Sequence, residues 1–373
     1  MKKALSVLLV SAVLLAIVFA FTACASLFRN PSEGLEYTLN YNGISYSVTG
    51  IGTCTDKDIV IPSEYSGLPV TEIGDNAFSG CSDITSIQIP DSVKYIGGQA
   101  FADCSGITSI KIPKSVTYIG GHAFSNCSRL TSVVIPNSVE YIGEYAFADC
   151  SSLTSISIPK AAGSIRSHAF SGCSSLTSVS IGSGVKSIGE YAFAGCSSLT
   201  SVSIGSDVKS IGEYAFAGCS SLTSINIPDG VSSIGTFAFR YCKNLRTIGI
   251  PSQVTSIGSH VFADCTGLES VNFEANSQLQ TIGDHAFYNC SKLTAIKIPQ
   301  SVTSIGYQAF YNCWQIKSIN IPAGVTSIGD SAFLYCYGLK NVSYSGDKAA
   351  WEKIAIGSDN SQLTSAEISY KDA

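Results

Sequence analysis

Two consecutive stretches, SVSIGSGVKSIGEYAFAGCSSLT at residues 178–200 and SVSIGSDVKSIGEYAFAGCSSLT at 201–223, differ only where Gly184 is replaced by Asp207. The period of 23 residues extends from this pair in both directions. Cysteines recur at this interval from Cys81 to Cys265 and, after a two-residue insertion, from Cys290 to Cys336. Twelve units are in register, which predicts a solenoid in which each coil packs only against its neighbours.

Each unit repeats the same apolar positions. The unit at Leu153 begins L-x-x-I-x-I-P, and most units continue with V and then I-G-x-x-A-F-x-x-C. The alternating L-x-x-I-x-I segment predicts a short strand, and stacked copies predict a parallel sheet. Proline lacks an N–H for the sheet and should end the strand. In A-F-x-x-C, Ala and Cys are four residues apart, which predicts a single helical turn with both on one face.

A glycine follows the Ile of the I-G-x-x-A-F segment in every unit except one, where Arg166 takes its place after Ile165. Glycine at a repeated position indicates either unusual backbone angles or a close approach between coils.

This pattern resembles the BspA-like, or Treponema pallidum-type, leucine-rich repeat surface lipoprotein family over roughly residues 54–345. The resemblance implies a leucine-rich repeat solenoid of stacked 23-residue coils, with a parallel β-sheet on one face, short helical turns on the other and a cap at each end. Members of this family are often bacterial surface proteins that bind host matrix proteins or other cells. An adhesin-like role is therefore what the resemblance implies for this chain.

The N-terminus reads as a targeting segment. Lys2 and Lys3 precede an apolar stretch from Ala4 to Phe21, the pattern of a signal peptide. The following Phe21-Thr22-Ala23-Cys24 resembles the lipobox of bacterial lipoproteins, in which the cysteine is acylated. An ordinary secretory signal is the second interpretation, and an uncleaved membrane-spanning helix is the third, because about 18 apolar residues reach the lower limit for crossing a bilayer. All three place the rest of the chain outside the cytoplasm.

We therefore divide the chain into five segments. Residues 1–23 form the signal peptide, 24–34 the lipidated cysteine and a tether, 35–70 an N-terminal cap with a partial first repeat, 71–343 the solenoid and 344–373 a C-terminal cap. Within the first cap, Asn42-Gly43 lies between two alternating runs and predicts a hairpin. In the second, Trp351 and Ile356 are placed to cover the last coil.

The twelve repeat cysteines allow two interpretations. In-register coils about 4.8 Å apart fall within the Cα separation that a disulfide permits, so a redox or metal array is one of them. Parallel Cβ atoms at that same spacing are wider apart than a bridge prefers, and free cysteine is among the most buried residue types. We therefore favour a ladder of buried free thiols.

Several function classes lack their usual signals. Only 13% of residues are charged, the net charge is −5, and no run of Lys or Arg occurs, which argues against a nucleic-acid partner. No nucleophile is paired with His and an acid, and no glycine-rich phosphate loop follows a strand, so we expect neither enzymatic activity nor a cofactor. His260 and His285 are neighbours in the repeat, but no clear third ligand joins them, so we expect no metal site.

One repeat position, five residues before Cys, is rich in aromatic side chains. An aromatic stripe on a neutral solenoid is a feature that binding partners use. We expect a candidate binding stripe here, and partial burial against the next coil is the equally weighted alternative. The stripe consists of Tyr145, His168, Tyr191, Tyr214, Phe237 and His260.

From these observations we expect the main partner to be a protein ligand on a host matrix or cell surface, with a glycan as the second candidate. The lipid anchor would attach the chain to the membrane. A passive structural envelope lipoprotein and a glycan-binding receptor or scaffold remain alternative functions.

Overall fold

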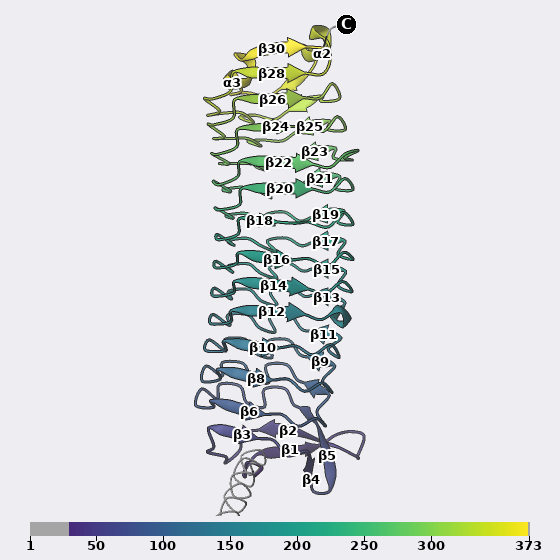
Figure 1. The fold of residues 1–373 in the computed structure, drawn as a ribbon, viewed down its shortest axis with the longest axis vertical. Helices are drawn as coiled ribbons and strands as arrows, with labels where there is room; N and C mark the ends of the chain where they lie inside the picture. The colour runs from purple at the N-terminus through teal and green to yellow at the C-terminus, as the bar shows by residue number, and fades with distance from the viewer. Residues whose placement is uncertain (1–29, 372–373) are drawn as a thin grey trace, which may run out of the picture.

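The computed structural model describes residues 30–371, so the predicted signal peptide and the lipidation of Cys24 lie outside the described residues. The described chain winds into about 14 coils, stacked as a straight, elongated solenoid from the N-terminal coils to the C-terminal end (Figure 1). The predicted fold class, a solenoid of 23-residue coils with a parallel sheet along one face, is confirmed.

The L-x-x-I-x-I segments form that face. Its strands fall into four parallel sheets, in which most strands pair with the strand 23 residues further on, so that Ser155 lies beside Ser178 and Ile158 beside Ile181. Pro159 directly follows β12 and ends it, as its missing N–H requires. The strands of this face are β3 (Asp58–Val60), β6 (Ser86–Gln88), β8 (Ser109–Lys111), β10 (Ser132–Val134), β12 (Ser155–Ile158), β14 (Ser178–Ile181), β16 (Ser201–Ser203), β18 (Ser224–Ile225), β20 (Thr247–Ile250), β22 (Ser270–Phe273), β24 (Ala295–Lys297), β26 (Ser318–Ile321), β28 (Asn341–Tyr344) and β30 (Glu367–Tyr370).

A second set of parallel strands, each of two residues, ends at the Ile of the I-G-x-x-A-F segment. The register is again one coil, as where Ile188 lies beside Ile211. The set consists of β7 (Tyr95–Ile96), β9 (Tyr118–Ile119), β11 (Tyr141–Ile142), β13 (Ser164–Ile165), β15 (Ser187–Ile188), β17 (Ser210–Ile211), β19 (Ser233–Ile234), β21 (Ser256–Ile257), β23 (Thr281–Ile282), β25 (Ser304–Ile305), β27 (Ser327–Ile328) and β29 (Ala355–Ile356).

The predicted helical turn at A-F-x-x-C is wrong. The segment is a chain of tight turns in which two residues per coil have positive φ, for example His122 at 55° and Asn126 at 57°. These left-handed residues turn their N–H groups toward the next coil: the N–H of His122 donates to the carbonyl of Glu144 and that of Asn126 to the carbonyl of Ala148, each at 2.8 Å. A helix would keep these donors within its own turn, so inter-coil bonding replaces it.

The repeated glycine marks a close approach between coils. A Cβ added at Gly143 would lie 2.4 Å from the backbone nitrogen of Gly121, and one at Gly120 would lie 2.5 Å from that of Gly98. Where Arg166 replaces the glycine, the second set of strands is interrupted: β11 and β13 belong to different sheets. A further interruption separates β19 from β21.

The core lies between the two sets of strands and the turns. In one coil Leu153, Ile156, Ile158, Ile165 and Phe170 are all buried. The twelve repeat phenylalanines, from Phe78 to Phe333, form one continuous stack with ring centroids 5.0–5.6 Å apart. Because every coil shares its apolar surface with two neighbours, stability is a nearest-neighbour property.

Both ends of the solenoid are covered by segments that leave the repeat. At the N-terminal end, β1 (Glu36–Leu39) and β2 (Tyr46–Gly50) form the predicted antiparallel hairpin, which continues into β5 (Leu68–Ile73) with β4 (Glu64–Tyr65) beside it. At the other end, the short helices α2 (Lys348–Trp351) and α3 (Ser361–Thr364) flank the last strands. The 3₁₀ turn η1 (Lys160–Ala162) lies mid-solenoid. Among residues 30–371, no helix has the length and hydropathy needed to cross a membrane.

Candidate binding surface

The predicted stripe is a single column of stacked rings. Neighbouring centroids lie 4.3–4.5 Å apart and the planes are within 18° of parallel. The column extends one coil beyond the stripe at each end, to His122 and His285. All its members are half-buried. The faces of the rings therefore cover one another, and the edges, with the tyrosine hydroxyls and histidine nitrogens, are what a partner would contact.

The backbone beneath this column is left-handed. Tyr191 and Tyr214 both have φ of 52°, a conformation that costs a bulky side chain about 1–2 kcal/mol. Two interactions offset this cost. The N–H of Tyr191 donates to the carbonyl of Glu213 at 2.8 Å, and each aromatic stack contributes about 0.5–1.5 kcal/mol. The column is therefore part of the scaffold as well as a surface.

Acidic residues border the stripe on one side. Glu144, Glu190, Glu213 and Asp284 occupy the position directly before the column, and all four are exposed. Exposed carboxylates beside aromatic ring edges give this face a negative potential, which favours a partner with a basic surface.

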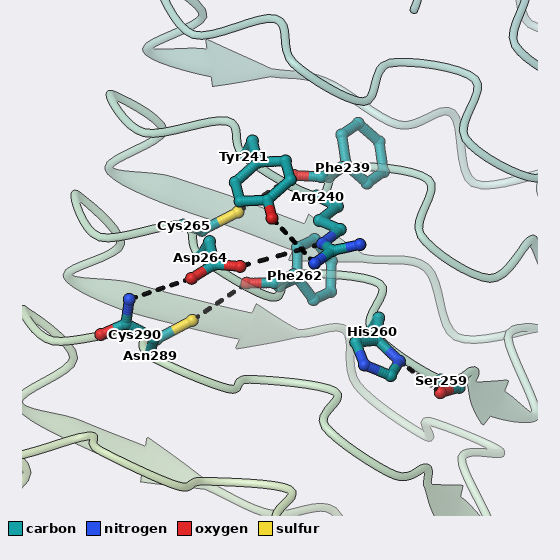
Figure 2. A network of polar contacts seen from close by, with 10 residues as sticks. All are labelled: Phe239, Arg240, Tyr241, Ser259, His260, Phe262, Asp264, Cys265, Asn289 and Cys290. Atoms are coloured by element: carbon teal, nitrogen blue, oxygen red, sulfur yellow. Dashed lines mark hydrogen bonds and ion pairs between the residues drawn. The ribbon is translucent and has the colours of Figure 1, made fainter.

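The pKa values of the two histidines of the stripe are lowered from the ordinary value. Burial lowers the pKa of His168; burial, followed by the neighbouring His285 and Arg240, lowers that of His260. Serine hydroxyls contact the ring nitrogens, with Ser167 Oγ 2.8 Å from His168 Nδ1 and Ser259 Oγ 2.6 Å from His260 Nδ1 (Figure 2). A cationic ring in the stack would lose solvation, which explains the direction of both shifts.

Eleven of the twelve repeat cysteines form the buried ladder of free thiols that the sequence favours, and the first, Cys81, is half-buried. In eleven of them, from Cys104 to Cys336, the thiol donates to the carbonyl oxygen of Phe in the preceding coil, as Cys265 does to Phe239 and Cys290 to Phe262 (Figure 2). Burial raises the pKa of the Cys173 and Cys242 thiols to about 12. Thiols held protonated in this way are poor nucleophiles and metal ligands.

A polar network that sequence reasoning missed crosses four coils beside the stripe, and Figure 2 shows its part from Arg240 to Asn289. Arg240 donates to the hydroxyl of Tyr241 at 2.8 Å, and its Nε lies 3.8 Å from Asp264 Oδ2. Asp264 Oδ1 in turn accepts from Asn289 at 3.0 Å, and Asn289 Oδ1 accepts from Asn312 at 2.9 Å. Apart from Arg240, which lies one residue earlier, these side chains occupy the second left-handed position, directly before Cys, which is Gly, Asp or Asn in ten of twelve units. Gly, Asp and Asn adopt positive φ most readily, so their preference at this position is the sequence signal that could have revealed it.

Within residues 30–371, no group of three or more His, Cys, Asp or Glu side chains is arranged to hold a metal ion. His260 and His285 stack face to face at 4.3 Å. Nδ1 of His260 contacts the Ser259 hydroxyl, and Nδ1 of His285 is buried.

The family model for the BspA-type leucine-rich repeat region matches residues 71–198, 163–278 and 272–369. The chain belongs to the BspA-type leucine-rich repeat family. Leucine-rich repeat solenoids of this kind generally serve as binding scaffolds, and no enzyme family is indicated. A comparison with curated proteins gives no match.

The chain is similar to solved structures of bacterial leucine-rich repeat proteins. A leucine-rich repeat protein from Bacteroides ovatus is 26% identical over 92% of this chain and 100% of its own, with a TM-score of 0.58. A leucine rich cell surface protein from Faecalibacterium prausnitzii is 29% identical over 88% of this chain and 97% of its own, with a TM-score of 0.46. A leucine-rich repeat protein from Eubacterium ventriosum is 22% identical over 82% of this chain and 94% of its own, with a TM-score of 0.43.

Proposed function

We propose that this BspA-type protein is displayed on a bacterial cell surface and binds a protein of a host or of a neighbouring cell, in the manner of an adhesin. The observation that carries the proposal is the stripe of stacked rings along the solenoid. From Tyr145 to His260 it extends over five coil spacings, roughly 24 Å. Aromatic residues with polar tips are the type enriched at protein interfaces.

The acidic border narrows the class of partner. Because Glu144, Glu190 and Glu213 are exposed next to the stripe, a protein with a basic surface would be attracted to it and a strongly acidic one repelled. Binding through this face is expected to weaken as salt screens these charges.

The test uses soluble protein comprising residues 25–373, applied to immobilised matrix proteins and to host cells. We expect saturable binding that is lost in the double variant Tyr191→Gln, Tyr214→Gln. Glutamine is compatible with this column, because Gln99 and Gln308 occupy it with φ of 54° and 51°.

The matched control removes two tyrosines from a different column. Tyr118 and Tyr141 also stack at 4.4 Å and are half-buried, and other coils carry Ser at this position. Tyr118→Ser, Tyr141→Ser should leave binding unchanged. If the stripe variant binds as tightly as the unsubstituted protein, the stripe is excluded as the binding surface. If the folded protein binds to none of the surfaces tested, a passive structural role in the envelope is favoured.

Display at the membrane is proposed through Cys24, on the strength of the lipobox-like residues before it. Expression of the whole chain in a bacterium with labelled palmitate should place the label in the protein and the protein in the membrane fraction. The Cys24→Ser variant should carry no label. A labelled Cys24→Ser protein, or an unlabelled protein in the culture medium, would contradict lipidation at this residue.

A further inference from the structure

The corner of each coil directly after Cys changes character along the solenoid. In the seven coils from Cys81 to Cys219 its four residues are nearly uncharged, and four successive coils have S-S-L-T, at 151–154, 174–177, 197–200 and 220–223. Asp83 and Arg129 are the two charges there and cancel. The repeat itself therefore requires no charge at this corner.

From Cys242 onward the same corner is basic. We call residues 243–246, 266–269, 291–294, 314–317 and 337–340 the C-terminal corner. It holds five cations and one carboxylate, Glu269, a net charge of +4 in a chain whose net charge is −5. All five cations are exposed. They are Lys243, Arg246, Lys292, Lys317 and Lys340.

The coil stacking brings these residues together. The N–H of Glu269 donates to the carbonyl of Arg246 at 2.8 Å, and the N–H of Lys340 to that of Lys317 at 3.0 Å, so residues far apart in sequence occupy one column. The next coil ends the column with Glu367, whose N–H donates to Lys340.

A small hollow of about 220 Å³ opens at the end of the C-terminal corner that is nearest to Cys242. It is lined by Lys243, Asn244, Arg246, Thr266, Gly267 and Lys292. Among the side chains that the structure describes, none of the five cations has a carboxylate within ion-pair distance. The positive charge is therefore available to a ligand.

Two exposed aromatic rings continue the corner toward the C-terminus. Trp314 and Tyr337 directly follow Cys313 and Cys336, so they occupy the repeat position that Lys243 holds in its coil. Their exposed fractions are 48% and 70%, and the N–H of Gly338 donates to the carbonyl of Trp314 at 3.0 Å, which places the two coils in register. Serine suffices at this position in most other coils, so the fold does not require the rings.

We propose that the C-terminal corner binds a linear acidic polysaccharide lying along the solenoid axis, with its sulfate or carboxylate groups on the cations and its sugar faces on Trp314 and Tyr337. The shape of the corner favours this class of ligand over a globular protein. Four coil spacings give a length of roughly 19 Å, and four residues span at most about 14 Å. The resulting patch of about 270 Å² is well below the roughly 800 Å² per partner of a standard protein interface. The surface is distinct from the acidic-bordered stripe and does not depend on the protein ligand proposed above.

The experiment measures binding of residues 25–373 to immobilised heparin, as a sulfated polymer, and to polyuronate, as a carboxylate polymer, over a series of salt concentrations. Dextran serves as the neutral polysaccharide, polyglutamate as an acidic peptide and single-stranded DNA as a nucleic acid. We expect binding to heparin or polyuronate, with the stronger of the two identifying the anionic group, and none to dextran.

The variants restore the residues that the chain itself uses elsewhere. Lys243→Ser, Arg246→Thr, Lys292→Ser should weaken polysaccharide binding at least tenfold and lower the slope of log affinity against log salt by about two units, since three counterion-releasing contacts are lost. The matched control, Lys94→Ser, Lys160→Ser, Lys209→Ser, removes three exposed lysines elsewhere and should leave both quantities unchanged. Circular dichroism confirms the fold of each variant.

A second variant separates sugar recognition from charge. Trp314→Ser, Tyr337→Ser should weaken binding to the polysaccharide several-fold and leave any residual binding to polyglutamate unchanged. The proposal is overturned if the two triple variants behave alike, if neither acidic polysaccharide binds, or if polyglutamate or DNA binds as tightly as the polysaccharide.

Discussion

Gly143 tests how closely adjacent coils must approach. In Gly143→Ala the new Cβ would lie 2.4 Å from the nitrogen of Gly121 and 2.5 Å from the carbonyl carbon of Gly120. Both are backbone atoms, which cannot rotate away as a side chain can. The two coils must therefore separate locally by about 1 Å to recover ordinary van der Waals contact.

Two contributions set the size of the effect. Overpacking of this kind typically costs about 1–3 kcal/mol. Separation also weakens the 2.8 Å bond from the N–H of Gly143 to the carbonyl of Ile119, which contributes about 1 kcal/mol. We expect the free energy of unfolding to fall by about 3 kcal/mol.

Urea denaturation followed by far-ultraviolet circular dichroism measures the change. Gly249→Ala is the matched control, because a Cβ at Gly249 would meet no atom within 4 Å. Its unfolding free energy should change by less than about 0.5 kcal/mol. If Gly143→Ala shifts the urea midpoint no more than Gly249→Ala does, the coils are not held at the separation described here and the steric explanation of the glycine column fails.

Three further predictions concern thiols, pH and repeat number. Among the described cysteines only Cys54 and Cys81, which are half-buried, should react readily with iodoacetamide in native protein at pH 8. Fast labelling of the other eleven, measured by mass spectrometry, would contradict the buried ladder. Because the folded-state pKa values of His168 and His260 lie below the unfolded value of 6.5, the unfolded state binds more protons, so the free energy of unfolding should be greatest above pH 6.5 and decrease as the pH falls toward 5. The double variant His168→Tyr, His260→Tyr should flatten the dependence of the urea midpoint on pH, and an unchanged dependence would exclude these residues as its source. Deletion of residues 178–200 joins Thr177 to a residue identical with the one removed, so the shortened protein should unfold cooperatively with a urea slope reduced in proportion to the length lost, and a non-cooperative transition would show that the coils are not interchangeable.

Most of the fold could be predicted from the 23-residue period of the sequence. The strand face, the pairing of residues 23 apart and the buried thiols all follow from apolar positions that recur in register, because a one-residue slip would expose the whole set. The helical turn at A-F-x-x-C was inferred from the spacing of Ala and Cys alone. Left-handed residues such as His122 cannot be recognised from spacing, and they redirect the N–H groups that a helix would need.

The candidate surfaces were less accessible to sequence reading. The aromatic stripe could be recognised in the sequence because its members share one repeat position. Their face-to-face stacking, which leaves only the ring edges exposed, is seen only in the structure. The basic C-terminal corner escaped notice because its cations are separated by 3 to 46 residues and form no run. Coil stacking converts that separation into neighbouring positions along the axis.

The direction of the inter-coil hydrogen bonds has a mechanical consequence. In parallel coils these bonds run along the solenoid axis. If the N-terminus is held at a membrane and a ligand is bound near the C-terminus, as proposed above, tension between the two would load the coil interfaces one after another and not in parallel. A coil that peels away frees 23 residues, which extend to about 78 Å in place of a rise of about 5 Å. Under shear such a rod would lengthen stepwise and absorb work coil by coil, so that a pulled ligand experiences a limited force instead of an abrupt load.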